Sequence, residues 1–324
     1  MRYDEILDVA EKKMNENGLH EAMTFRGTET GYTRLSNDQF FKTIALKLRT
    51  IDAVPSDTRT LLFGQSLSTP IIAGAMSRPA WKMENCLTAW AKGAKDSGSM
   101  MGAGIVSSED FALIMETGVP TYRISKPFKD RDKMASIIRE AERLGAVAVG
   151  TDIDFVLGQK AGDRVFHGNE MAPLRFEELL DLRKETRLPF IIKGILHEDD
   201  AEKALKIGAD AIVLSNHRGV VLDYCAHPLE VLPAIRGVVG REMTILVDSG
   251  FMRGTDVLKA LAMGADGVLL GQAILLAAMA DGEAGVRDMI TEMTGQLQRA
   301  MTLTGCPDLE SLDESILLRR SFIL

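Results

Sequence analysis

Short runs of apolar, β-branched residues recur along this chain from about Pro70 onward, and amphipathic helical segments separate them. This alternation is typical of a parallel sheet whose strands are joined by crossover helices. We predict strands at residues 70–75, 99–104, 121–125, 147–154, 189–195, 209–216, 244–250 and 267–272. Eight such strand and helix units fit a closed (β/α)8 barrel, the TIM barrel, better than a doubly wound open sheet. The sequence therefore predicts an α/β fold of the (β/α)8 class.

The remaining segments are expected to pack around this barrel. Helical periodicity at residues 3–17 and 37–48 predicts an N-terminal helical extension over residues 1–69. Residues 284–302 are predicted to form a long closing helix, so that residues 70–324 hold the barrel with its C-terminal closing helices. Although 324 residues could form two domains, α/β barrels use this length for one fold, and we expect a single domain overall.

Charge and cysteine usage narrow the partners and the compartment. A formal charge of −8 and a pI near 5.3 leave no basic surplus to neutralise nucleic acid or an anionic membrane. The 3 cysteines are far apart and lack metal-ligand spacing, which predicts no structural disulfide and no metal site. The N-terminus does not resemble a signal peptide, and no apolar run approaches the roughly 20 residues of a membrane span. We expect a cytoplasmic protein that acts on a small molecule.

Polar or glycine-rich residues end several of the predicted strands. In a barrel these C-terminal strand ends meet at one mouth, where active sites lie. The residues at these ends are Thr151, Asp152, Asp154, Lys193, Ser215, His217, Asp248, Ser249, Gly250, Gly271 and Gln272. Backbone N–H groups of the glycine-rich loops after the last two strands could hold a phosphate, helped by the following helix N-termini. The alternative is that these glycines serve only tight turns.

The stretch from Ile191 to His217 combines Lys-Gly, a helical segment and Ser-Asn-His. In this stretch the chain resembles the FMN-dependent α-hydroxy-acid oxidase and dehydrogenase family. The likeness continues through residues 253–268 and 281–286 and, more weakly, through 61–76, 107–108 and 129–131. The resemblance implies an oxidoreductase that acts on CH–OH groups with FMN across the barrel mouth. It also implies a homo-oligomer, since tetramers are common in this family.

The same resemblance implies roles for individual residues. Lys193 matches a lysine beside flavin N1, where a positive charge stabilises the reduced ring. His217 matches the base that takes a proton from the substrate while two electrons pass to flavin N5, a task that suits imidazole. Flavin contacts are expected from Ala73, Gly74, Ala75, Thr151, Lys193, Ser215, Asp248, Ser249, Gly250, Arg253, Gly271 and Gln272. The hydroxyls of Thr151 and Ser215 could instead only satisfy backbone groups.

The departures from the family pattern fall mostly on the substrate side. After Asn-His the family has Gly-Gly-Arg, and this chain has Arg218, Gly219 and Val220, so the arginine that pairs with a substrate carboxylate is absent there. A second family arginine is matched by Lys160. We expect Arg218, Arg123 and Lys160 to bind an anionic substrate with different geometry. The alternative for Arg218 is a solvated loop residue.

Two further departures concern the base and the cofactor phosphate. The aspartate that supports the family histidine aligns with Ile153, but Asp152 and Asp154 flank it. Strand residues two apart share a face, so both carboxylates can point into the mouth and serve catalysis. The family's phosphate arginines align with Met252 and Gln272, which leaves Arg253, Gly250, Gly271 and backbone amides to hold this group.

The sequence predicts an FMN-dependent oxidoreductase with His217 as base and a substrate other than lactate or glycolate. One alternative is the flavin-dependent modification or isomerisation of a biosynthetic intermediate or peptide. Another is a catalytically retired barrel that serves as a ligand-binding or interaction protein. The presence of both Lys193 and His217 argues against a retired site.

Overall fold

The computed structural model describes residues 1–17, 28–77, 86–157, 165–166 and 168–320. Eight parallel strands pair side by side in chain order, and β13 pairs with β4 to close the ring. The barrel strands are β4 (Ile71–Met76), β5 (Met101–Ala103), β6 (Thr121–Ser125), β7 (Ala148–Asp152), β10 (Phe190–Ile195), β11 (Ala211–Leu214), β12 (Thr244–Val247) and β13 (Gly267–Leu270). The predicted (β/α)8 barrel is confirmed.

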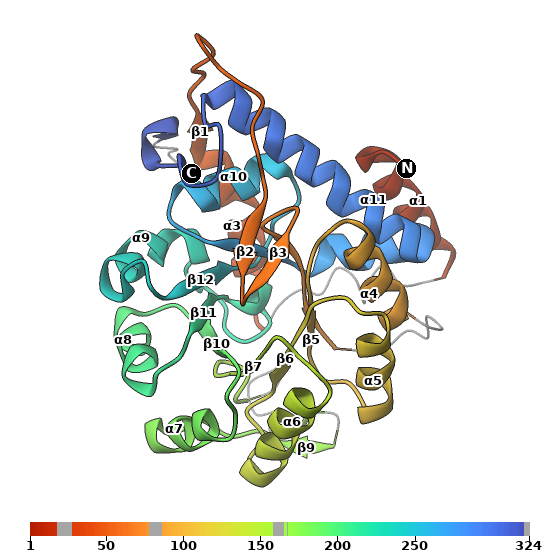
Figure 1. Cartoon of the computed structure of the whole chain (residues 1–324), viewed down its shortest axis with the longest axis vertical. Coiled ribbons are helices and arrows are strands. Elements are labelled where there is room, and N and C mark those ends of the chain that lie inside the picture. The colour runs from red at the N-terminus through yellow and green to blue at the C-terminus, as the bar shows by residue number, and fades with distance from the viewer. Residues whose placement is uncertain (18–27, 78–85, 158–164, 167, 321–324) are drawn as a thin grey trace.

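Helices surround this barrel (Figure 1). They are α4 (Cys86–Asp96), α5 (Ser108–Glu116), α6 (Arg131–Arg143), α7 (Phe176–Lys184), α8 (Glu198–Ile207), α9 (Pro228–Val239), α10 (Gly254–Ala262) and α11 (Gln272–Thr304). The closing helix expected at residues 284–302 is the later part of α11, which bends at Asp281 and Gly282, where the backbone leaves the helical conformation. Among the described residues, no helix has the length and apolar character needed to span a membrane.

The N-terminal segment packs on the barrel but is less helical than expected. The expected helix over residues 37–48 is wrong beyond Phe40, because residues 44–46 form an edge pairing with a strand near the other end of the chain. Such a distant pairing overrides local helical periodicity. The elements are α1 (Tyr3–Glu16), α3 (Tyr32–Phe40), the short turn η1 (Phe41–Thr43), and β1 (Ile44–Leu46), which pairs with β14 (Leu317–Arg319) after η3 (Glu314–Ile316).

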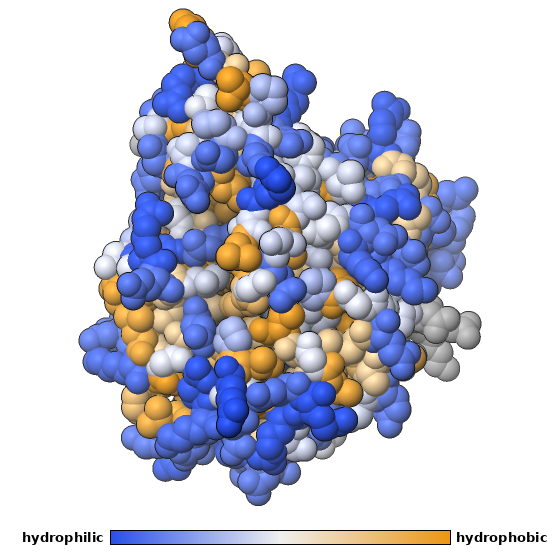
Figure 2. Space-filling model, in the orientation of Figure 1, coloured by the Kyte–Doolittle hydropathy of each residue, from blue (hydrophilic) through white to orange (hydrophobic). Residues whose placement is uncertain are grey.

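A hairpin closes the N-terminal end of the barrel. Its strands are β2 (Thr60–Leu62) and β3 (Gln65–Leu67), and a second small hairpin pairs β8 (Val165–Phe166) with β9 (Asn169–Glu170). Leu62 and Leu67 are buried in the apolar cluster inside the barrel. Figure 2 shows the face that carries the β2–β3 hairpin, with hydrophilic side chains around its periphery and apolar ones near its middle. The polar mouth therefore lies at the opposite end.

Alternate strand residues build two apolar layers. Inside the barrel, residues such as Ile72, Tyr122 and Leu246 pack against one another. Their neighbours in sequence, such as Ile71 and Val247, pack outward against the helices. This two-sided burial fits the continuous apolar runs of the sequence, since strands in all-parallel sheets are covered on both faces. It holds the strand ends, and the side chains that follow them, in fixed positions at the mouth.

Candidate active site at the barrel mouth

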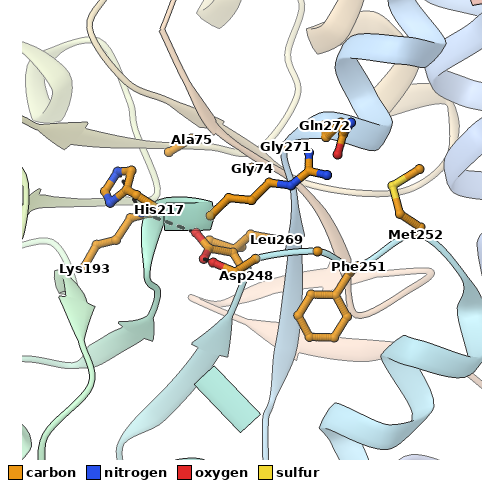
Figure 3. Close-up of a pocket in the computed structure, with 13 residues that line it drawn as sticks. Gly74, Ala75, Lys193, His217, Asp248, Phe251, Met252, Leu269, Gly271 and Gln272 are labelled. Carbon is orange, nitrogen blue, oxygen red and sulfur yellow. Dashed lines mark hydrogen bonds and ion pairs between the residues drawn. The ribbon is translucent and has the colours of Figure 1, made fainter. Parts of the chain in front are cut away.

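A pocket opens at the C-terminal ends of the barrel strands (Figure 3). It is lined by residues in the C-terminal parts of β4, β10 and β13 and in the segments that follow β11, β12 and β13. The expected flavin-contacting residues that line it are Gly74, Ala75, Lys193, Asp248, Ser249, Gly250, Gly271 and Gln272, and His217 and Arg218 join them. Most of the predicted site residues therefore lie together in this pocket.

Three predicted flavin contacts lie beside the pocket or below it. Ala73 is buried within β4. The Thr151 hydroxyl is fully buried and donates to two backbone carbonyls at 3.0 and 3.3 Å, which favours its structural alternative. Ser215 is also buried, and its hydroxyl accepts from Nζ of Lys193 at 3.0 Å and from the backbone N–H of His217 at 3.1 Å. Ser215 thus orients the two residues given central roles by the sequence.

His217 begins the short turn η2 (His217–Gly219) that follows β11. Its Nδ1 lies 2.5 Å from Oδ2 of Asp154. Its Nε2 lies 3.1 Å from Nζ of Lys126 and 3.3 Å from Nζ of Lys193. Ammonium groups only donate, so Nε2 accepts, and the ring hydrogen sits on Nδ1, where it is donated to the carboxylate. This leaves His217 with a lone pair on Nε2, as a general base requires.

Asp152 and Asp154 have different partners. Oδ2 of the buried Asp152 lies 2.5 Å from Nζ of Lys126, and Oδ1 lies 3.4 Å from Nζ of Lys193. Burial opposes the charge of this carboxylate, but Lys126 and Lys193 outweigh burial and hold the pKa of Asp152 well below its ordinary value. Asp152 is therefore the counter-ion of the lysines, whereas Asp154 is the partner of His217.

Lys193 stays charged although it is buried. Burial opposes its charge, but the carboxylates of Asp248 and Asp152 outweigh this effect and raise the pKa of Lys193 above its ordinary value. Oδ2 of Asp248 lies 3.3 Å from Nζ of Lys193.

The side chains of Asp152, Asp154 and His217 offer three metal-ligating atoms within 4.8 Å of one another. The ammonium groups of Lys126 and Lys193 already occupy the positive positions next to the carboxylate of Asp152.

Lys126 is a site residue that the sequence did not predict. It directly follows β6, and its Nζ lies 4.3 Å from the centre of the Phe155 ring. Its place after a strand is the signal that identified the other mouth residues. A lysine at the end of a strand is ordinarily solvated, and here only 8% of Lys126 is exposed. Burial beside Asp152 cannot be inferred from the residue type.

Arg123 does not reach the pocket, contrary to expectation. Its neighbours Tyr122 and Ile124 face the barrel interior, so Arg123 on β6 faces outward. Its guanidinium lies 2.5 Å from Oε2 of Glu140 on α6 and 4.3 Å from the ring centre of Phe111 on α5. Arg123 therefore links the strand to its covering helices.

The other predicted cations have three different locations. Arg253 lies 4.2 Å above the Tyr3 ring and 3.5 Å from Oδ1 of Asp4, so it faces α1 and does not line the pocket. Lys160 lies outside the described residues. Arg218 lines the pocket, as expected for a ligand-binding residue. The single arginine in the described lining of this pocket is thus Arg218.

An unpredicted asparagine pair supports the turn that carries His217. The side-chain amides of Asn37 on α3 and Asn216 donate to each other, at 3.0 and 2.9 Å. Oδ1 of Asn216 also accepts the backbone N–H of Arg218 at 2.9 Å. This support matters because His217 and Arg218 have φ angles of 45° and 55°, in the left-handed region that costs non-glycine residues about 1–3 kcal/mol each.

Comparisons with known proteins point to one group of enzymes. The family model described as FMN-dependent dehydrogenase matches residues 10–173 and 156–319. The chain is 31% identical to a 2-hydroxyacid oxidase of Dictyostelium discoideum, over 98% of this chain and 91% of that protein. It is 30% identical to an L-lactate oxidase of Nostoc sp., over 88% and 89% of the two chains. A solved mandelate oxidase variant with an FMN adduct superposes with a TM-score of 0.86 at 27% identity, over 94% of this chain and 97% of that chain.

Proposed function

This chain belongs to the FMN-dependent dehydrogenase family, and from that premise we propose that His217 is the base in the oxidation of a hydroxy acid. The chain is an oxidoreductase acting on CH–OH groups, and FMN is its cofactor. When bound, FMN supplies the acceptor for the two electrons of the oxidation. The expected cytoplasmic location and homo-oligomeric state stay predictions.

The residues at the mouth fit this cofactor. Gly74 lines the pocket, and a Cβ there would lie 3.1 Å from the carbonyl oxygen of Leu270 on the neighbouring strand, which leaves little room for a side chain. Lys193 supplies a charged, buried ammonium at one end. At the other end, buried polar atoms of Arg218 and Gln272 lack hydrogen-bond partners among the described residues. A flat, polar ligand with an anionic end suits such a pocket.

The observation that carries the proposal is the pair formed by His217 and Asp154. Nε2 of His217 accepts from Lys126 and Lys193 in this structure. When the substrate replaces these contacts, the same lone pair would accept the proton that the substrate loses from its α-carbon or hydroxyl. The resulting imidazolium would lie 2.5 Å from the carboxylate of Asp154, which stabilises its charge and fixes the ring orientation. The backbone N–H of His217 donates to the hydroxyl of Ser215. This hydrogen bond positions the imidazole ring before the substrate arrives.

We assign recognition of the substrate's anionic group to Lys126. Its Nζ lies 3.1 Å from Nε2 of His217, so a substrate that presents its hydroxyl to Nε2 also lies beside this ammonium. Lysine offers a point charge without the planar fork with which arginine grips a carboxylate. Since Val220 stands where the family has such an arginine, we propose a hydroxy acid other than lactate or glycolate as the substrate.

Anaerobic mixing with a panel of hydroxy acids tests this function. We expect mandelate-like or larger hydroxy acids to bleach the flavin absorption, and lactate and glycolate to leave it unchanged. A His217→Asn variant should bind FMN and resist bleaching. The matched control His197→Asn alters an exposed histidine that caps α8 and should bleach normally. Equal bleaching of the His217 variant would reject the base. Product formed without net bleaching would instead indicate isomerisation.

A further inference from the structure

We infer that Arg218 binds the phosphate group of FMN and thereby supplies the positive charge at the phosphate end of the pocket. The inference concerns how this chain retains its cofactor and does not depend on the role proposed for His217. It also changes the sequence-based expectation, which placed Arg218 with the substrate.

The turn η2 sends its first two side chains in different directions. His217 reaches Asp154, beyond the end of β7. Nη2 of Arg218 lies instead 3.9 Å from Oδ1 of Asp38, and that same oxygen is 3.7 Å from where a Cβ on Gly250 would be. The Arg218 guanidinium therefore lies near the loop that follows β12. Adjacent residues thus serve opposite sides of the mouth.

The two ends of the pocket carry different side chains (Figure 3). His217 and Lys193 lie at the first end, and Met252 and Gln272 lie at the second. Lys193 is engaged by two aspartates and cannot serve the far end. Helix α11 begins there, at Gly271 and Gln272, so its N-terminal N–H groups favour an anion. Without Arg218, the described lining of this second end would carry no cationic side chain.

The Arg218 side chain is built into the protein but incompletely paired. Only 22% of it is exposed, which rules out the solvated-loop alternative. Burial lowers the pKa of Arg218, and the distant carboxylate of Asp38 offsets this only in part. Its Nε is buried and has no hydrogen-bond partner among the described residues. A phosphate oxygen would accept from this guanidinium, as charge-assisted pairs of arginine and phosphate commonly do.

A comparison of the dissociation constants for FMN and riboflavin isolates the contribution of the phosphate group to binding. The apoprotein is titrated with each flavin, and quenching of flavin fluorescence gives both dissociation constants. Arg218→Gln should raise the Kd for FMN by about 10- to 100-fold, the loss expected for a charged hydrogen bond. The Kd for riboflavin should stay within about twofold, because riboflavin lacks the phosphate. Arg34→Gln removes an equal charge near Arg218 from outside the pocket lining and should change neither constant by more than about twofold.

A second variant distinguishes the loss of positive charge from a disturbance of the fold in the Arg218→Gln protein. Adding Met252→Arg to Arg218→Gln returns a guanidinium to the same end of the pocket and should restore much of the preference for FMN over riboflavin. Equal losses of FMN and riboflavin affinity would overturn the inference, because they would show a general effect on the turn. An unchanged Kd for FMN together with a raised KM for the substrate would also overturn it and return Arg218 to the substrate side. Neither outcome affects the bleaching test of His217.

Discussion

Replacing Asp154 by asparagine removes the charge next to His217 and keeps an acceptor of the same shape. The carboxylate lies 2.5 Å from Nδ1, and 13% of the side chain is exposed. At an effective dielectric constant of about 20, unit charges at this separation attract by about 6–7 kcal/mol. About half of this should be lost from the transition state, since proton transfer is incomplete there and Asp152 also attracts the ring from 3.6 Å. A loss of about 3 kcal/mol slows the step about 150-fold.

The assay is the rate at which saturating substrate bleaches the flavin in a rapid anaerobic mixing experiment. Asp154→Asn should slow this rate and leave the Kd for FMN unchanged. The control Asp181→Asn changes an exposed aspartate on α7 and should have no effect on either quantity. A bleaching rate within about threefold of the unmodified protein would refute the idea that the carboxylate stabilises a protonated His217, because loss of a charge at this distance should slow the step far more.

Three further predictions address stability and substrate binding. Asn37→Ala leaves the buried amide of Asn216 short of partners and should lower the free energy of unfolding by about 1–3 kcal/mol in urea titrations, whereas an unchanged midpoint would show that the pair is dispensable. Burial lowers the pKa of His227 to about 3, so only the unfolded chain gains this proton as the pH falls below about 6.5. Stability should therefore fall by about 1.4 kcal/mol per pH unit from pH 6.5 towards 5, and His227→Gln should remove this slope. Lys126→Met should raise KM for an anionic substrate at least about tenfold with no change in FMN affinity, and an unchanged KM would contradict its assignment.

The barrel could be predicted because its signal is local and repeated. Each apolar run is bounded by polar or glycine residues, and the ends of such runs meet in space once the strands are parallel. This pattern alone placed His217, Lys193 and Asp154 together, as the structure has them. The helix expected at residues 37–48 ends at Phe40 in the structure, because β1 pairs with β14, a partner that local periodicity cannot reveal.

The errors at the site have physical causes of the same kind. The sequence predicts Arg123 at the mouth, but this residue is one position out of phase with the side chains that face the barrel interior. A shift of one residue along a strand reverses the face. The burial of Lys126 could not be predicted because it depends on Asp152, which lies on another strand. The direction of the Arg218 side chain depends on the positive φ angle of this residue, and no residue type in the turn predicts that angle.

The two consecutive left-handed residues of η2 also bear on how this protein could be engineered. Glycine at position 217 or 218 would relieve backbone strain, and a screen for heat resistance would tend to accept it. The same replacements would delete the imidazole or the guanidinium that the strained turn carries. Selection for robustness and selection for chemistry therefore oppose each other at this turn, and a stabilisation campaign should hold both positions fixed.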